Sequence, residues 1–81
     1  MRNRRRALGL IDRDLREARR VLDGVSRKIR NVRFHVKRNL FRVRHLLVDI
    51  FDIHEEIHRE RPDLIPAYLR GTWYEQKPRP R

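Results

Sequence analysis

Two histidines late in the chain have a spacing that could support metal chemistry. His54-Glu55-Glu56-Ile57-His58 matches the pattern H-E-x-x-H. On a helix, residues four apart share one face, so the two imidazoles could hold a zinc ion between them. The neighbouring Glu55 could then act as a general base on a zinc-bound water. This role requires a third ligand and a fold that encloses the site.

The surroundings of the motif do not supply those parts. No histidine follows His58, and Glu60 lies too close, on nearly the same turn, to complete a zinc site. Glu55-x-x-His58 also resembles half of a di-iron carboxylate helix, but the sequence shows no matching inward carboxylates. No serine or cysteine nucleophile arrangement and no Gly-rich phosphate loop is present. The sequence therefore predicts a protein that is not an enzyme, with no catalytic residue, metal site, cofactor or small-molecule substrate.

Charge is the strongest compositional signal. The 81 residues carry 22 Lys and Arg against 11 Asp and Glu, a net charge of +11. Such a balance favours polyanionic partners, with nucleic acid first and an anionic membrane surface second. The absence of cysteine excludes a disulfide framework and a thiolate metal site, and no apolar run is long enough to predict a transmembrane segment. The length suits one small domain.

An apolar 3-4 repeat predicts an all-α fold built on one long coiled-coil helix. From Leu8 to Ile57, alternate steps of three and four residues meet an aliphatic side chain at every position except Asn39. No β-strand produces this period, and its persistence is typical of a coiled coil. At 1.5 Å per residue, fifty helical residues form a rod of about 75 Å. The apolar stripe of such a rod must be covered by a partner helix.

Two local patterns in the sequence are alternatives to a continuous helix. Asp23-Gly24, with Ser26 behind it, has the composition of a helix stop, a turn and an N-cap. The repeat runs through Gly24 unchanged, which favours a continuous helix over a break there. The stretches 32–36 and 41–45 alternate as the strands of a β-hairpin do, but the longer period explains more residues.

The expected organisation has four segments: a basic N-terminal arm (1–6), the long helix (7–61), a short C-terminal helix (62–71) and an extended basic tail (72–81). Pro62 ends the long helix and Gly71 ends the short one. The short segment either folds back over Phe41, Val48 and Phe51 or over a neighbouring chain, or it docks on an unrelated partner protein.

The stripe is expected to form the interface of a parallel homo-oligomer. Flanking charges give a slight preference for parallel pairing between chains. Asn39 is interpreted either as a selector of register and oligomer state or as a tolerated polar residue near a break in the seam. The predicted oligomerisation residues are Leu15, Leu22, Ile29, Val36, Asn39, Val43, Leu46, Ile50, Ile53 and Ile57.

The second half of the predicted helix carries a second apolar face. A two-stranded rod would expose these side chains as a contiguous patch, which predicts a further partner. The predicted partner-docking residues are Phe34, Phe41, Val48, Phe51 and Trp73.

A long stretch without acidic residues is the best candidate for nucleic-acid contacts. It lies between Asp23 and Asp49, and fixed cations without acidic partners suit phosphate contacts. The alternative is an ordinary solvated helix surface. The predicted contact residues, with those of the N-terminal cluster, are Arg2, Arg4, Arg5, Arg6, Arg27, Lys28, Arg30, Arg33, Lys37, Arg38, Arg42 and Arg44.

Together these features predict a structural, nucleic-acid-associated component of a larger assembly that binds DNA or RNA without sequence specificity. The alternatives are a protein-interaction adaptor or small subunit of a multi-protein complex and, more weakly, a helix on a membrane surface. The expected location is intracellular, in cytoplasm or nucleoid, or in a virion, with an organellar address ranked lower.

Overall fold

The computed structural model describes residues 3–76, without the side chains of Trp73 and Gln76. The elements are α1 (Arg4–Val32), α2 (Val36–Glu60), the 3-10 helices η1 (Pro62–Leu64) and η2 (Ala67–Leu69), and the short α3 (Trp73–Gln76). The all-α prediction is confirmed. No strand occurs among the described residues, so the β-hairpin alternative is wrong.

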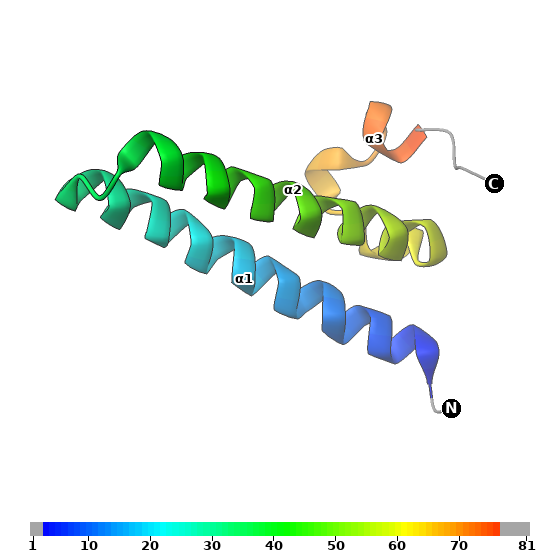
Figure 1. Cartoon of the computed structure of the whole chain (residues 1–81). Coiled ribbons are helices and arrows are strands. Elements are labelled where there is room, and N and C mark those ends of the chain that lie inside the picture. The colour runs from blue at the N-terminus through cyan, green and yellow to red at the C-terminus, as the bar shows by residue number, and fades with distance from the viewer. Residues whose placement is uncertain (1–2, 77–81) are drawn as a thin grey trace.

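The prediction of one continuous helix over 7–61 is wrong. The chain reverses after Val32, and α2 runs back antiparallel beside α1 as a helical hairpin (Figure 1). The longest extent of the hairpin is 42 Å, far less than the length of the rod expected from the repeat. The apolar stripe on α1 is therefore covered by α2, the second half of the same chain.

The turn is closed by hydrogen bonds that satisfy the last carbonyls of α1. The Arg33 N–H donates to the Arg30 carbonyl, and the Phe34 N–H donates to the Ile29 carbonyl at 3.1 Å. This is the Schellman arrangement, which places the residue after the helix in the left-handed region. Arg33 has φ 55° there, although glycine is the residue that adopts this conformation most easily.

Asn39 also contributes to this turn. Its side-chain amide donates to the Phe34 carbonyl at 3.1 Å, and its backbone N–H donates to the His35 carbonyl at 2.9 Å. The one polar residue of the apolar repeat thus binds a turn carbonyl within its own chain. Its predicted role in oligomer register stays a prediction.

The prediction that helix continues through Gly24 is correct, because Gly24 lies inside α1. The repeat does not reveal the turn, because Val32 and Val36, which flank the turn, are four residues apart. That spacing is the one a continuous helix would show. A turn can therefore preserve the phase of a repeat when its length happens to match one of the steps.

The core of the hairpin is small and lies to one side of the predicted seam. The buried apolar residues are Ile29, Val43, Ile57 and Ile65. Three members of the repeat, Ile11, Leu46 and Ile53, remain at least 43% exposed. Polar residues next to members of the repeat, Asp12, His54 and His58, are buried in the interface instead.

The C-terminal segment contains two 3-10 turns where one short helix was expected. Pro62 opens η1, and Pro66 precedes η2. The Arg70 guanidinium ties the turns together by donating to the carbonyls of Asp63 and Ile65. The segment lies beside the C-terminal half of α2 (Figure 1). It leaves Phe41 and Val48 exposed, so the prediction that it covers them is wrong.

The open end of the hairpin is joined by arginines. Arg4 forms a bidentate pair with Glu60, at 2.8 and 2.7 Å, and this guanidinium lowers the pKa of the Glu60 carboxyl below its ordinary value. Arg61 donates to the Arg5 carbonyl at 2.7 Å. The predicted free arm 1–6 is therefore partly helix from Arg4 onward. Within residues 3–76, no helix is long and apolar enough to span a membrane.

Candidate functional site

The hairpin brings a carboxylate of α1 against the two histidines of the H-E-x-x-H motif. His54 Nδ1 lies 2.5 Å from Asp12 Oδ1, and His58 Nε2 lies 3.1 Å from the same oxygen. The exposed fractions are 2% for Asp12, 4% for His54 and 6% for His58. The His54 ring, one residue from the repeat member Ile53, is therefore part of the interior.

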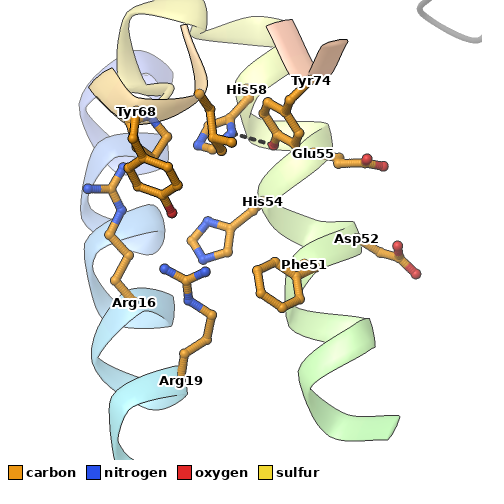
Figure 2. Close-up of a pocket in the computed structure, with 11 residues that line it drawn as sticks. Arg16, Arg19, Phe51, Asp52, His54, Glu55, His58, Tyr68 and Tyr74 are labelled. Carbon is orange, nitrogen blue, oxygen red and sulfur yellow. Dashed lines mark hydrogen bonds between the residues drawn. The ribbon is translucent and has the colours of Figure 1, made fainter. Parts of the chain in front are cut away.

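The protonation of this cluster follows from its burial. Burial lowers the pKa of His58 below its ordinary value, so its ring is neutral at neutral pH. Burial also raises the pKa of Tyr74, so its hydroxyl keeps its proton. The His58 Nε2–H then donates to Asp12, and its Nδ1 accepts from the Tyr74 hydroxyl at 2.7 Å (Figure 2). Tyr74 thereby holds the ring with Nε2 directed at the carboxylate.

Arg16 compensates the negative charge of the buried carboxylate. Its guanidinium lies 2.9 Å from Asp12 Oδ2, one helical turn away on α1. The same guanidinium nitrogen donates to the Leu64 carbonyl at 2.8 Å. Arg16 therefore links the cluster to the C-terminal segment that covers it.

A cavity of about 310 Å³ adjoins the cluster between α1, α2 and η2 (Figure 2). Aromatic and apolar walls come from Phe51, Pro66, Tyr68 and Leu69, and polar groups from Arg16, Arg19, Asp52, His54, Glu55, His58 and Tyr74. Arg19 lies over the Phe51 ring, 5.0 Å from its centroid. Two buried nitrogens, Arg19 Nε and His54 Nε2, make no hydrogen bond to any residue in the described part of the chain.

The acid-free stretch is gathered at the opposite end of the molecule, around the turn. We call this surface the basic end. It comprises Arg27, Lys28, Arg30, Arg33, Lys37, Arg38, Arg42 and Arg44, all of them exposed. A hollow between the helices there is lined by Arg27, Arg30 and Arg44 over Leu40, Val43 and Leu47, with Asp23 and Ser26 at its border. The fold therefore brings together eight predicted contact residues that the sequence had spread along a rod.

The remaining predicted site residues lie elsewhere. Arg4 and Arg5 lie at the open end, where they pair with Glu60 and Asp63. Arg6 is exposed on the first turns of α1, and Arg2 lies outside the described residues. Phe34, Phe41, Val48 and Phe51 are each about half exposed, with Phe34 in the turn and Phe51 in the cavity wall. The side chain of Trp73 is not among those described.

Sequence reasoning missed Asp12 as the partner of the two histidines. No signal in the sequence distinguished Asp12, because Asp14 and Glu17 lie close to it on the same helix. Its partner could not be found without the position of the turn. No protein-family model matches this chain, and neither the curated proteins nor the solved structures contain a match.

Proposed function

We propose that this protein is a non-enzymatic, nucleic-acid-associated protein that binds the phosphate backbone through its basic end. The observation that carries the proposal is the concentration of eight exposed cations around one turn, on a stretch without an acidic side chain between Asp23 and Asp49. When a dense group of cations neutralises phosphates, the counterions condensed on the nucleic acid are released. This release favours binding to DNA or RNA irrespective of sequence.

The arrangement of the basic end supports this proposal over an ordinary solvated helix surface. On a solvated surface, acidic and basic groups alternate and pair, as Arg20 does with Glu17 on the first half of α1. At the basic end, the nearest acidic positions in the sequence lie at its borders. Arginine dominates the set, and its planar guanidinium suits bidentate phosphate contacts. Phe34 and Phe41, exposed among these cations, offer surfaces on which unpaired bases could stack.

Neutralising part of the basic end is expected to weaken nucleic-acid binding strongly. The variant Arg30→Ala/Lys37→Ala/Arg44→Ala removes three exposed cations from both helices. Fluorescence anisotropy with short duplex DNA, duplex RNA and single strands would follow binding from about 50 to 200 mM salt. The slope of log affinity against log salt should fall by nearly one for each phosphate contact removed.

The matched control is Arg6→Ala/Arg13→Ala/Arg20→Ala, which removes the same charge from the other half of α1. It should retain most of the affinity if the basic end makes the contacts. Equal losses in both variants, or no binding by the unmodified chain at about 50 mM salt, would contradict the proposal.

A second proposal concerns self-association, and the exposed part of the predicted seam supports it. Leu46 and Ile53 lie on the outside of the hairpin, with Phe41 and Val48 also exposed on α2. A two-helix hairpin with four buried apolar residues has a small core, and small domains commonly gain stability by oligomerisation. We therefore propose that hairpins pair through the exposed face of α2 that carries Leu46 and Ile53, in a homo-oligomer which could form part of a larger assembly.

Charge placed on this face is expected to dissociate the oligomer. Sedimentation equilibrium of the unmodified chain should give a multiple of the 10.1 kDa monomer mass. Leu46→Glu/Ile53→Glu should shift the mass towards the monomer. Val21→Glu, at an exposed apolar position of α1 outside the repeat, should leave it unchanged. A monomeric unmodified chain at high concentration would rule this proposal out.

A further inference from the structure

We infer that Asp12, His54 and His58 form a binding site for one divalent transition-metal ion of the zinc class. This inference is independent of the proposed nucleic-acid binding, which concerns the other end of the hairpin. It rests on three observations: the convergence of three ligand atoms, the support of those ligands by neighbouring side chains, and an unpartnered buried imidazole nitrogen beside a cavity.

The ligand atoms already surround a common point. One ligand atom from each of the three residues lies within 4.8 Å of the other two, and all three side chains are buried. Two imidazoles and one carboxylate are a ligand set used by zinc and by ferrous iron. The two ring nitrogens both point at the same carboxylate oxygen, at 2.5 and 3.1 Å. Ligand atoms of a tetrahedral zinc ion lie about 3.3 Å apart, so a small outward shift of the His54 ring admits the ion.

Neighbouring side chains hold two of the three ligands, His58 and Asp12, in the way metal sites require. The second ring nitrogen of a ligating histidine usually has a hydrogen-bond partner that fixes the ring orientation. For His58 this partner is the Tyr74 hydroxyl, and for Asp12 the Arg16 guanidinium holds the second carboxylate oxygen. Both ligands are therefore oriented before any ion arrives, which lowers the entropic cost of binding.

The cavity beside His54 gives the site room for an additional ligand. Three protein ligands leave one tetrahedral position for water or a small molecule. His54 lines the cavity and its Nε2 makes no hydrogen bond to a described residue, and the same holds for Arg19 Nε in the cavity wall (Figure 2). An arginine Nε–H is always a donor, so it requires an acceptor.

The charge of the site also favours an anion as this additional ligand. A divalent ion with one carboxylate and two neutral imidazoles carries a net positive charge, and in the cavity wall Arg16 and Arg19 balance the carboxylates of Asp52 and Glu55. A small anion, such as hydroxide or a carboxylate, would offset this charge. It would also accept a hydrogen bond from the Arg19 Nε–H, which has no partner among the described residues. The site we infer is thus a metal ion with a small anion bound beside it.

Titration of the full, metal-free chain with zinc tests the inference. Calorimetry should find one zinc ion per chain, and zinc should raise the thermal unfolding midpoint because the ion binds the folded state. Asp12→Asn and His58→Gln should each abolish one-to-one binding. Tyr74→Phe, which keeps all three ligands, should weaken zinc binding about tenfold or more. The control His35→Gln/His45→Gln removes the two exposed histidines and should bind zinc as the unmodified chain does.

A measurement on the unmodified chain keeps the test decisive if a variant fails to fold. Imidazole ¹⁵N resonances should shift on zinc addition for His54 and His58 and stay unchanged for His35 and His45. Cobalt(II) should give the visible absorption of a four- or five-coordinate site. The inference is overturned if the imidazole resonances of His54 and His58 do not respond, or if zinc binding survives in folded Asp12→Asn or is lost in the His35/His45 control.

Discussion

Replacing Asp12 by alanine is expected to lower the free energy of unfolding by about 3 kcal/mol. The carboxylate accepts from His54 and His58 and forms an ion pair with Arg16, and its loss leaves two buried imidazole N–H groups without an acceptor. Each unsatisfied buried donor costs about 1–3 kcal/mol. Urea denaturation followed by far-UV circular dichroism would measure the loss, with EDTA present so that no metal contributes to stability.

Asp14→Ala is the matched control for this variant. Asp14 is two residues away on the same helix, and its exposed carboxylate lies 3.6 Å from Arg13. Surface substitutions of this kind change stability by less than about 0.5 kcal/mol. Equal stability of the two variants would mean that Asp12 is not the buried hub of the interface and would contradict the packing of α1 against α2 described above.

Replacing Ile57 by alanine is expected to lower the free energy of unfolding by about 3 kcal/mol. The side chain is 3% exposed, and its removal creates a cavity in a core with few other apolar members. Small cores relax incompletely around such a cavity, so the lost contacts are not replaced. Thermal and urea unfolding at a protein concentration where the chain is monomeric would measure the effect.

Ile53→Ala, one turn earlier, separates the hairpin from a continuous coiled coil. Ile53 is 43% exposed, so alanine there should cost less than about 1 kcal/mol in the monomer. In a single long helix, both residues would be seam positions of equal importance. At monomeric concentration such a helix would have no partner to cover its seam, so equally small losses for Ile53→Ala and Ile57→Ala would count against the hairpin.

Helix formation could be predicted from the sequence alone. The 3-4 spacing of aliphatic residues excludes strands and requires each helix to cover an apolar stripe. The end of α2 was also predictable, because Pro62 disfavours helix in the residue before it, and α2 does end at Glu60. These features depend on local sterics and on spacing along one helix. Neither requires knowledge of which segments meet.

The position of the turn was not readable from the sequence. Gly24 is the residue with the strongest turn preference in the first half of the chain, yet it lies within α1. The chain turns instead at Arg33, which adopts the left-handed conformation without the advantage of glycine. Packing decides between the two. A turn at 33–35 makes α1 and α2 nearly equal in length, so that most of each stripe is covered.

The candidate metal site depends on this position of the turn. On a continuous helix, Asp12 and His54, which are 42 positions apart, would be separated by about 63 Å. In the hairpin, their side chains lie 2.5 Å apart. The sequence by itself determined one helix-forming apolar stripe, a basic stretch and the H-E-x-x-H spacing, since all of these are local. Only the tertiary structure decided that the third ligand comes from the first helix, because a contact between distant residues depends on where the chain reverses.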